Sequence, residues 1–200
     1  AVGASYPITM IFMAIAVGSN IGCSVIISQY FGAKWYEKMK TAIYTTLIAS
    51  VALSLLLTAA GLLGSRAMMA AINTPENIFA DGALYLRIYI GGFVFLFLYN
   101  VATGIFNSMG DSRTPLYFLI GSSLGNIVLD LIFVAVFHWD VAGVAWATFI
   151  AQGIACVLAL NALRKRLASI ETEGKVELFS WNMLGRISRI AVPSILQQSF

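Results

Sequence analysis

The chain has 200 residues, of which 60% are hydrophobic and 10% charged, and its mean hydropathy is +0.86. Soluble domains carry about 25% charged residues, so this composition excludes a soluble globular class and indicates a membrane protein that crosses the bilayer several times. The formal net charge of +3 is too small to indicate nucleic-acid binding and bears on orientation in the membrane instead.

Five segments are long and apolar enough to cross a bilayer, because a spanning helix needs about 20 mostly apolar residues. In chain order they are residues 5–31, 41–63, 83–107, 115–138 and 141–163, and a sixth apolar helix begins near Ile187. Thr114 and Pro115 are typical of the cap and first residue of a helix. Only a short turn at Trp139 separates the fourth and fifth segments. The sequence therefore predicts an all-α, polytopic membrane helix bundle in which these two spans form a tight antiparallel hairpin.

The basic residues alternate between the two sides of the membrane. Ten of the twelve lysines and arginines lie in or beside three connections, at residues 32–40, 108–114 and 164–186, and the other connections contribute Arg66 and Arg87. Because basic loops remain in the cytoplasm, the sequence predicts that these three connections are cytoplasmic. We expect a multi-pass protein of the plasma membrane, which in a bacterium is the inner membrane.

A polar linker, residues 169–180 (SIETEGKVELFS), interrupts the apolar pattern after the fifth span. Apolar residues then recur with helical spacing from Trp181 to Ala191, while Arg186 and Arg189 lie off that stripe. This pattern predicts an amphipathic helix that lies at the membrane interface and leads into the next span.

These observations divide the chain into three predicted parts. They are a transmembrane lobe at residues 1–167, a cytoplasmic linker with an amphipathic helix at 168–186, and the start of a second lobe at 187–200. The chain lacks an initiator methionine and ends within an apolar helix. We therefore expect it to be an internal fragment of a longer protein.

Small residues recur at four-residue spacing on three of the spans. The pairs are Gly18 and Gly22, Gly121 and Gly125, and Gly143 and Ala147. Such spacing lets helices approach closely in lipid. It predicts close packing within the chain, and oligomerisation is not required.

Asp130 is the only charged residue within the apolar run 117–137. A carboxylate in hydrocarbon costs several kcal/mol and usually faces a bundle interior or a water-filled cavity. Asn126 lies one turn earlier on the same helical face. Counting outward from the hairpin turn at 1.5 Å per residue places Asp130 and Thr148 at similar depth on adjacent helices.

A carboxylate, an amide and a hydroxyl at this depth would suit a proton or Na⁺. Burial raises the pKa of a carboxyl group, whereas hydrogen-bond donors or a cation lower it, so such a group can load and release a cation. The alternative is a structural role, in which a buried Asp130 is hydrogen-bonded to Asn126 and Thr148 and never titrates. Hydrogen bonds within the membrane contribute only about 0.6–2 kcal/mol of stability, which is less than the cost of burying a carboxylate.

Four further polar residues could line a cavity: Asn20, Asn100, Gln152 and Gln197. For the first three, packing between helices is the more ordinary role. Gln197, with its neighbour Gln198, begins the last apolar helix and could face a cleft between two lobes.

The motifs as an ordered set resemble those of the multidrug and toxic compound extrusion (MATE) transporters. They are MGDSRTP at 109–115, Asn126-xxx-Asp130, GVAWAT at 143–148, IISQYFGA at 26–33 and Pro193. The resemblance implies twelve helices in two lobes of six. This chain would then supply helices two to six of the N-lobe and the start of helix seven, and helix one would be missing.

The resemblance also implies a function and a site. It implies export of organic, often cationic substrates by alternating access in exchange for H⁺ or Na⁺, with no other cofactor. In several members the N-lobe cation site uses an aspartate and an asparagine of helix five and a threonine of helix six, which match Asp130, Asn126 and Thr148. A further aspartate on helix one belongs to that site. Members often have proline after the helix-five aspartate, and Leu131 at this position predicts a straighter helix.

Two other functional classes remain as alternatives. A flippase or exporter of lipid-linked oligosaccharides or polysaccharides, from the same broad superfamily, would need basic residues deep within the spans. An integral membrane enzyme would need histidines, cysteines or paired carboxylates at one depth, and Asp130 is the only deep carboxylate. We therefore expect a transporter that contacts lipid and small organic substrates, whose identity and coupling ion stay open.

Overall fold

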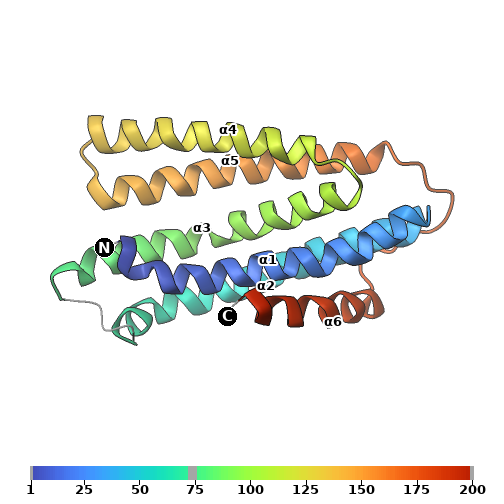
Figure 1. The fold of residues 1–200 in the computed structure, drawn as a ribbon, viewed down its shortest axis with the longest axis horizontal. Coiled ribbons are helices and arrows are strands. Elements are labelled where there is room, and N and C mark those ends of the chain that lie inside the picture. Colours follow the sequence, from blue (N-terminus) through green and yellow to red (C-terminus); the bar gives the residue numbers. More distant parts are fainter. Residues whose placement is uncertain (1, 72–75, 199–200) are drawn as a thin grey trace.

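The computed structural model describes residues 2–71 and 76–198, and these form six α-helices and one π-helical segment (Figure 1). The elements are α1 (Val2–Gly32), α2 (Tyr36–Ala71), α3 (Glu76–Ser108), α4 (Arg113–Leu131), η1 (Ile132–Val136), α5 (Asp140–Ala168) and α6 (Trp181–Gln198). Within these ranges no strand occurs. The predicted all-α class is therefore confirmed.

Five helices contain a stretch that is long and apolar enough to span a membrane. The stretches are Ile8–Gly32, Tyr36–Ser65, Gly82–Ser108, Arg113–Val136 and Ala142–Ala168. They coincide with the five predicted spans, and the chain is a multi-pass membrane protein. α2 is longer than predicted: its 36 residues extend about 54 Å, well beyond the roughly 30 Å hydrocarbon layer.

The spans differ in how much of their surface the bundle covers. α3 packs against α1, α2 and α5, whereas α4 contacts α5 closely and α3 only slightly. In Figure 1 the hairpin of α4 and α5 forms one edge, and α6 lies at the opposite edge beside α1 and α2. Within the most apolar 18-residue window of each span, 56% of the α3 residues are buried and none of the α4 residues is, although Pro115 at the start of α4 is buried. The hydrophobic core is therefore centred on α1 and α3, where Ile27, Phe93 and Phe97 are fully buried.

α6 is one continuous helix from Trp181 to Gln198 with Pro193 inside it, so the predicted boundary at residue 187 falls within a single element. The last two residues of the predicted second-lobe segment lie outside the described residues. The helix is amphipathic as predicted, and its buried face comprises Met183, Ile187 and Ala191, while Trp181 is exposed.

Gly18 and Gly22 let α6 approach α1 closely. A Cβ atom at Gly18 would lie 2.5 Å from Ile195, and one at Gly22 would lie 2.5 Å from the Ala191 methyl group. This pair therefore packs within the chain, as its spacing predicts. The equivalent atoms at Gly121 and Gly125 of α4 would meet nothing within 4 Å.

The start of α4 differs from the prediction. The helix begins at Arg113, and the side chain of its N-cap residue, Ser112, makes no capping bond. Asp111 supplies the cap instead: one carboxylate oxygen accepts the Thr114 backbone N–H at 3.1 Å and the other accepts the Thr114 hydroxyl at 2.7 Å. These bonds, led by that of the hydroxyl, hold the pKa of Asp111 below its ordinary value.

Candidate functional site

The predicted hairpin brings α4 and α5 side by side, with Asn126 and Asp130 on α4 and Thr148 on α5 (Figure 1). The turn between them is tight. His138 adopts a left-handed backbone conformation with φ of 54°, and the Trp139 N–H donates to the Phe133 carbonyl at 3.0 Å. The hairpin therefore holds the two site-bearing helices in a fixed antiparallel register.

The helix changes its winding directly after the aspartate. The chain continues without a break through Leu131, but the next five residues, Ile132–Val136, form a π-helix. Its last hydrogen bond, from the Phe137 N–H to the Ile132 carbonyl, has a length of 3.1 Å. Single π-helical turns inside α-helices are frequent at functional sites, because they disturb the regular backbone pairing and shift the direction of nearby side chains.

Two polar atoms of α4 have no hydrogen-bond partner. They are the Oδ1 atom of Asp130 and the Nδ2 atom of Asn126, both shielded from solvent and unbonded to any described residue. The Thr103 hydroxyl on α3 is in the same condition. An unsatisfied buried polar group costs about 1–3 kcal/mol, and a charged group costs more. These atoms are thus free to bind a ligand that is not part of the described chain.

The Thr148 hydroxyl does not donate a hydrogen bond to Asp130. Its hydroxyl donates to the Val144 carbonyl of its own helix at 3.0 Å, so its proton is engaged there. The oxygen of Thr148 can still accept a hydrogen bond or coordinate a cation through its lone pairs. The alternative in which Asp130 is bonded to both Asn126 and Thr148 therefore finds no support in this geometry.

A small cavity of about 110 Å³ lies beside Thr148, between α1, α3 and α5. Thr148 and Gln152 line it from α5, and Tyr85 and Tyr89 line it from α3. Tyr85 is also close enough to Asp130 to interact with it electrostatically. The cavity and the aspartate therefore belong to one region of the bundle.

Tyr85 and Tyr89 are the functional candidates that the sequence prediction missed. They lie four residues apart on α3, and their rings stack with centroids 6.3 Å apart. The available signal was this pair of hydroxyl-bearing aromatic residues near the start of an apolar span. This signal does not show which helix the two tyrosines face, because that depends on how α3 is rotated about its axis in the bundle.

Of the other predicted cavity residues, Gln152 lines the cavity and the rest do not gather there. Asn20 accepts a hydrogen bond from the Ser24 hydroxyl at 2.9 Å and packs against Gly104 of α3. The Asn100 side chain donates to the Leu96 carbonyl of its own helix at 2.8 Å. Gln197 is exposed near the end of α6. Asn20 and Asn100 thus make packing and local hydrogen-bond contacts in the structure.

Comparison with known proteins identifies the scaffold. The MatE family model matches residues 1–132, a stretch that includes Asn126 and Asp130. The probable multidrug resistance protein YoeA of Bacillus subtilis is 29% identical over 97% of this chain and 43% of its own length. The multidrug export protein MepA of Staphylococcus haemolyticus is 26% identical over 98% of this chain and 43% of its own length.

Solved structures agree with this result. A crystal structure of a MATE protein in complex with MaD3S superposes with a TM-score of 0.88 at 27% identity and covers 98% of this chain. An inward-facing multidrug resistance MATE family transporter has a TM-score of 0.86 at 25% identity. In both comparisons the chain spans 45% of the other protein, which corresponds to one lobe. The chain belongs to the MATE family of transporters.

Proposed function

We propose that this chain is the N-lobe of an exporter of small organic, often cationic compounds, which works by alternating access in exchange for H⁺ or Na⁺. Asp130, Asn126 and Thr148 bind the coupling cation in this proposal. The observation that carries it is the unbonded Asp130 oxygen within a membrane-spanning helix, one turn from an unbonded Asn126 amide. The names of the relatives, which refer to multidrug resistance and export, support the substrate class.

The chemistry follows from the cost of an unpaired charge in a medium of low polarity. An ionised Asp130 is costly in the span unless a proton or a cation neutralises it. A proton would convert the carboxylate to a neutral acid. Na⁺ would take oxygen ligands from Asp130, the Asn126 amide and Thr148, whose hydroxyl proton is already engaged by Val144. Either ion would stabilise the packed form of the hairpin, and its release would require water to reach the site.

From the size of the cavity we infer that the ion and the organic substrate bind at different sites. Pockets for drug-sized ligands have volumes of about 300–1,000 Å³. The cavity beside Thr148 has about 110 Å³, which suffices for water or an ion with part of its hydration shell. We therefore place the organic substrate in a cleft between this lobe and a second lobe, with Gln197 as a candidate lining residue.

The arrangement of the basic connections supports the proposed orientation. Lys40, near the start of α2, donates to the Ile170 carbonyl of the linker at 2.6 Å. Asp111, between α3 and α4, interacts electrostatically with Arg166 at the end of α5. All three basic connections thus gather at one end of the bundle (Figure 1). We propose that this end faces the cytoplasm of a bacterium and that residues 168–186 connect the two lobes.

The test is export by the complete protein that contains this chain, with Asp130→Asn. The substitution keeps the size of the side chain and removes the charge. We expect efflux of a cationic dye from cells to fall at least tenfold and to stop responding to imposed H⁺ or Na⁺ gradients. The exposed linker carboxylate variant Glu173→Gln should export like the wild type. Undiminished, gradient-driven efflux by Asp130→Asn would refute the coupling role.

A further inference from the structure

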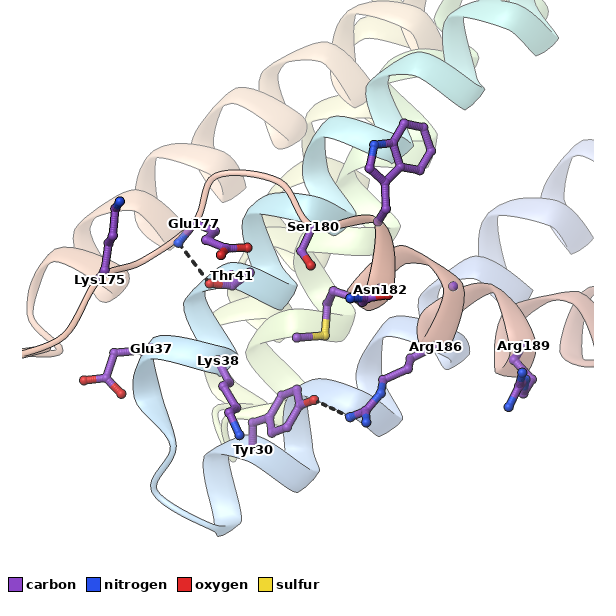
Figure 2. A pocket seen from close by; sticks show the side chains of 13 residues that line it. Tyr30, Glu37, Lys38, Thr41, Lys175, Glu177, Ser180, Asn182, Arg186 and Arg189 are labelled. Atoms are coloured by element: carbon purple, nitrogen blue, oxygen red, sulfur yellow. Dashed lines mark hydrogen bonds between the residues drawn. The ribbon is translucent and has the colours of Figure 1, made fainter.

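We propose that a basic pocket at the linker end of the bundle binds the phosphate group of an anionic lipid. The pocket has a volume of about 740 Å³ and lies between the end of α1, the start of α2, the linker and the first turns of α6 (Figure 2). It is separate from the site at Asp130 and from the cavity beside Thr148. The proposal does not depend on the coupling role of Asp130.

The pocket carries more positive than negative charge. Its four basic residues are Lys38, Lys175, Arg186 and Arg189, and its two acidic residues are Glu37 and Glu177, which leaves an excess of two positive charges. None of the four basic side chains forms an ion pair within the part of the chain that the structure describes. Glu37 is occupied otherwise, since its Oε1 accepts the Gly174 backbone N–H at 3.0 Å. The basic groups are therefore free to bind an anion.

Two of the cations are held in position by aromatic side chains. The Arg186 guanidinium donates to the Tyr30 hydroxyl at 3.0 Å, which leaves its other N–H groups available. The Lys38 ammonium lies over the Trp35 ring, 4.4 Å from its centroid. Figure 2 shows Lys38 and Arg186 on either side of Tyr30, with Arg189 further along α6. A guanidinium fixed in this way is suited to two-point binding of a phosphate.

The start of α6 adds a second attraction for an anion. Trp181, Asn182 and Met183, which form the first turn of this helix, line the pocket. The N–H groups of a first helical turn have no partner within the helix and carry a partial positive charge. The linker fixes this turn in place, because the Ser180 N–H donates to the Thr45 hydroxyl of α2 at 3.1 Å.

Exposed aromatic residues around the pocket indicate that the phosphate comes from a lipid rather than from solution. Trp35 and Trp181 are 53% and 78% exposed, and the linker residue Leu178 is 68% exposed. Tryptophan side chains concentrate at the boundary between lipid and water, and basic pockets at this level bind anionic headgroups. The pocket thus combines cations with an apolar rim that acyl chains can contact.

The experiment measures lipid binding by the complete protein in a neutral detergent. The probes are phosphatidylglycerol, phosphatidylcholine with the same acyl chains, and inorganic phosphate, each titrated while bound lipid is counted by native mass spectrometry and the melting temperature is recorded. Arg186→Gln and Arg189→Gln remove pocket charges, and Arg164→Gln removes an exposed charge outside the pocket. We expect each pocket variant to weaken phosphatidylglycerol binding about tenfold and the Arg164 variant to bind it like the wild type.

Three results would overturn the proposal. The first is unchanged phosphatidylglycerol binding in both pocket variants. The second is an equal loss of phosphatidylglycerol binding in Arg164→Gln, which would indicate diffuse attraction only. The third is equal affinity for inorganic phosphate and the lipid, which would indicate a site for a soluble anion. Arg186→Gln also removes the bond to Tyr30. If that variant has a lowered melting temperature without lipid, Arg189→Gln alone decides the outcome, since Arg189 makes no described hydrogen bond.

Discussion

Helices α1 and α4 are both apolar spans with a pair of glycines four residues apart, yet their surroundings differ. α1 packs against α2, α3 and α6, and 44% of the residues in its most apolar 18-residue window are buried. α4 packs mainly against α5, and no residue in its most apolar 18-residue window is buried. Gly22 of α1 meets Ala191 directly, whereas Gly125 of α4 faces open space. The same motif therefore marks a tight helix contact in one span and a free face in the other.

The polar groups of the two helices follow the same division. On α1, Asn20 and Ser24 bond to each other and Ser28 donates to the Val25 carbonyl. On α4, Asn126 and Asp130 each have a shielded atom without a partner in the described chain. The tightly packed helix thus has satisfied polar groups and serves as a scaffold. The loosely packed helix carries Asp130, which we propose binds and releases the coupling cation, and few contacts oppose movement of this helix.

The largest effect on stability is expected when a methyl group is added to the tight contact. Gly22→Ala would place a Cβ atom 2.5 Å from the Ala191 methyl group and 2.7 Å from its Cα, so backbone has to shift. Overpacking of this kind costs about 1–3 kcal/mol. The matched variant Gly125→Ala meets nothing within 4 Å and should gain up to about 1 kcal/mol from helix propensity. Thermal unfolding in detergent measures the stability of both variants. Equal melting temperatures of the two variants would contradict the difference in packing between α1 and α4.

A smaller effect is expected at the proposed cation site when the Thr148 hydroxyl is removed. Thr148→Val keeps the shape of this cavity-lining side chain and deletes its hydroxyl oxygen. The loss of one oxygen ligand should weaken apparent cation affinity about tenfold, which corresponds to about 1.4 kcal/mol. Cation dependence of dye export by the complete protein measures this affinity. An unchanged value would exclude Thr148 as a ligand, and Thr46→Val on α2, whose hydroxyl donates to the Ala42 carbonyl four residues earlier, provides the control.

The smallest effect is expected at the cap of α4 and depends on pH. The pKa of Asp111 is held below its ordinary value of 3.8, chiefly by the Thr114 hydroxyl. A lowered pKa means that the cap stabilises the protein above pH 3.8 and that this contribution is lost as the pH falls through the lowered value. Thr114→Val removes the hydroxyl donor and should move this loss to higher pH. Melting temperatures recorded from pH 6 downward measure the shift, and superimposable profiles would contradict it.

The spans and the hairpin could be predicted from the sequence, because hydropathy and turn residues act locally. The cap of α4 could not, since Asp111 and Thr114 are both capping residue types and only the backbone path decides between them. The boundary at residue 187 stays a prediction; the close contact of α6 with the glycines of α1 could not be predicted, because no local pattern contains it.

The role of Asp130, Asn126 and Thr148 stays a prediction. Counting from the turn predicts similar depths for Asp130 and Thr148, since the rise per residue of an α-helix is fixed. The rotation of each helix about its axis depends on packing, so the partner of the Thr148 hydroxyl and the position of Tyr85 beside the cavity could not be predicted.

The most direct test of the central claim is cation release by the purified complete protein on addition of substrate. In weakly buffered solution a pH-sensitive dye reports protons, and a sodium-sensitive dye reports Na⁺. The wild type should release one of the two ions in proportion to the substrate bound, and Asp130→Asn should bind substrate without releasing either. Equal release by Asp130→Asn and the wild type would show that the coupling cation is bound elsewhere.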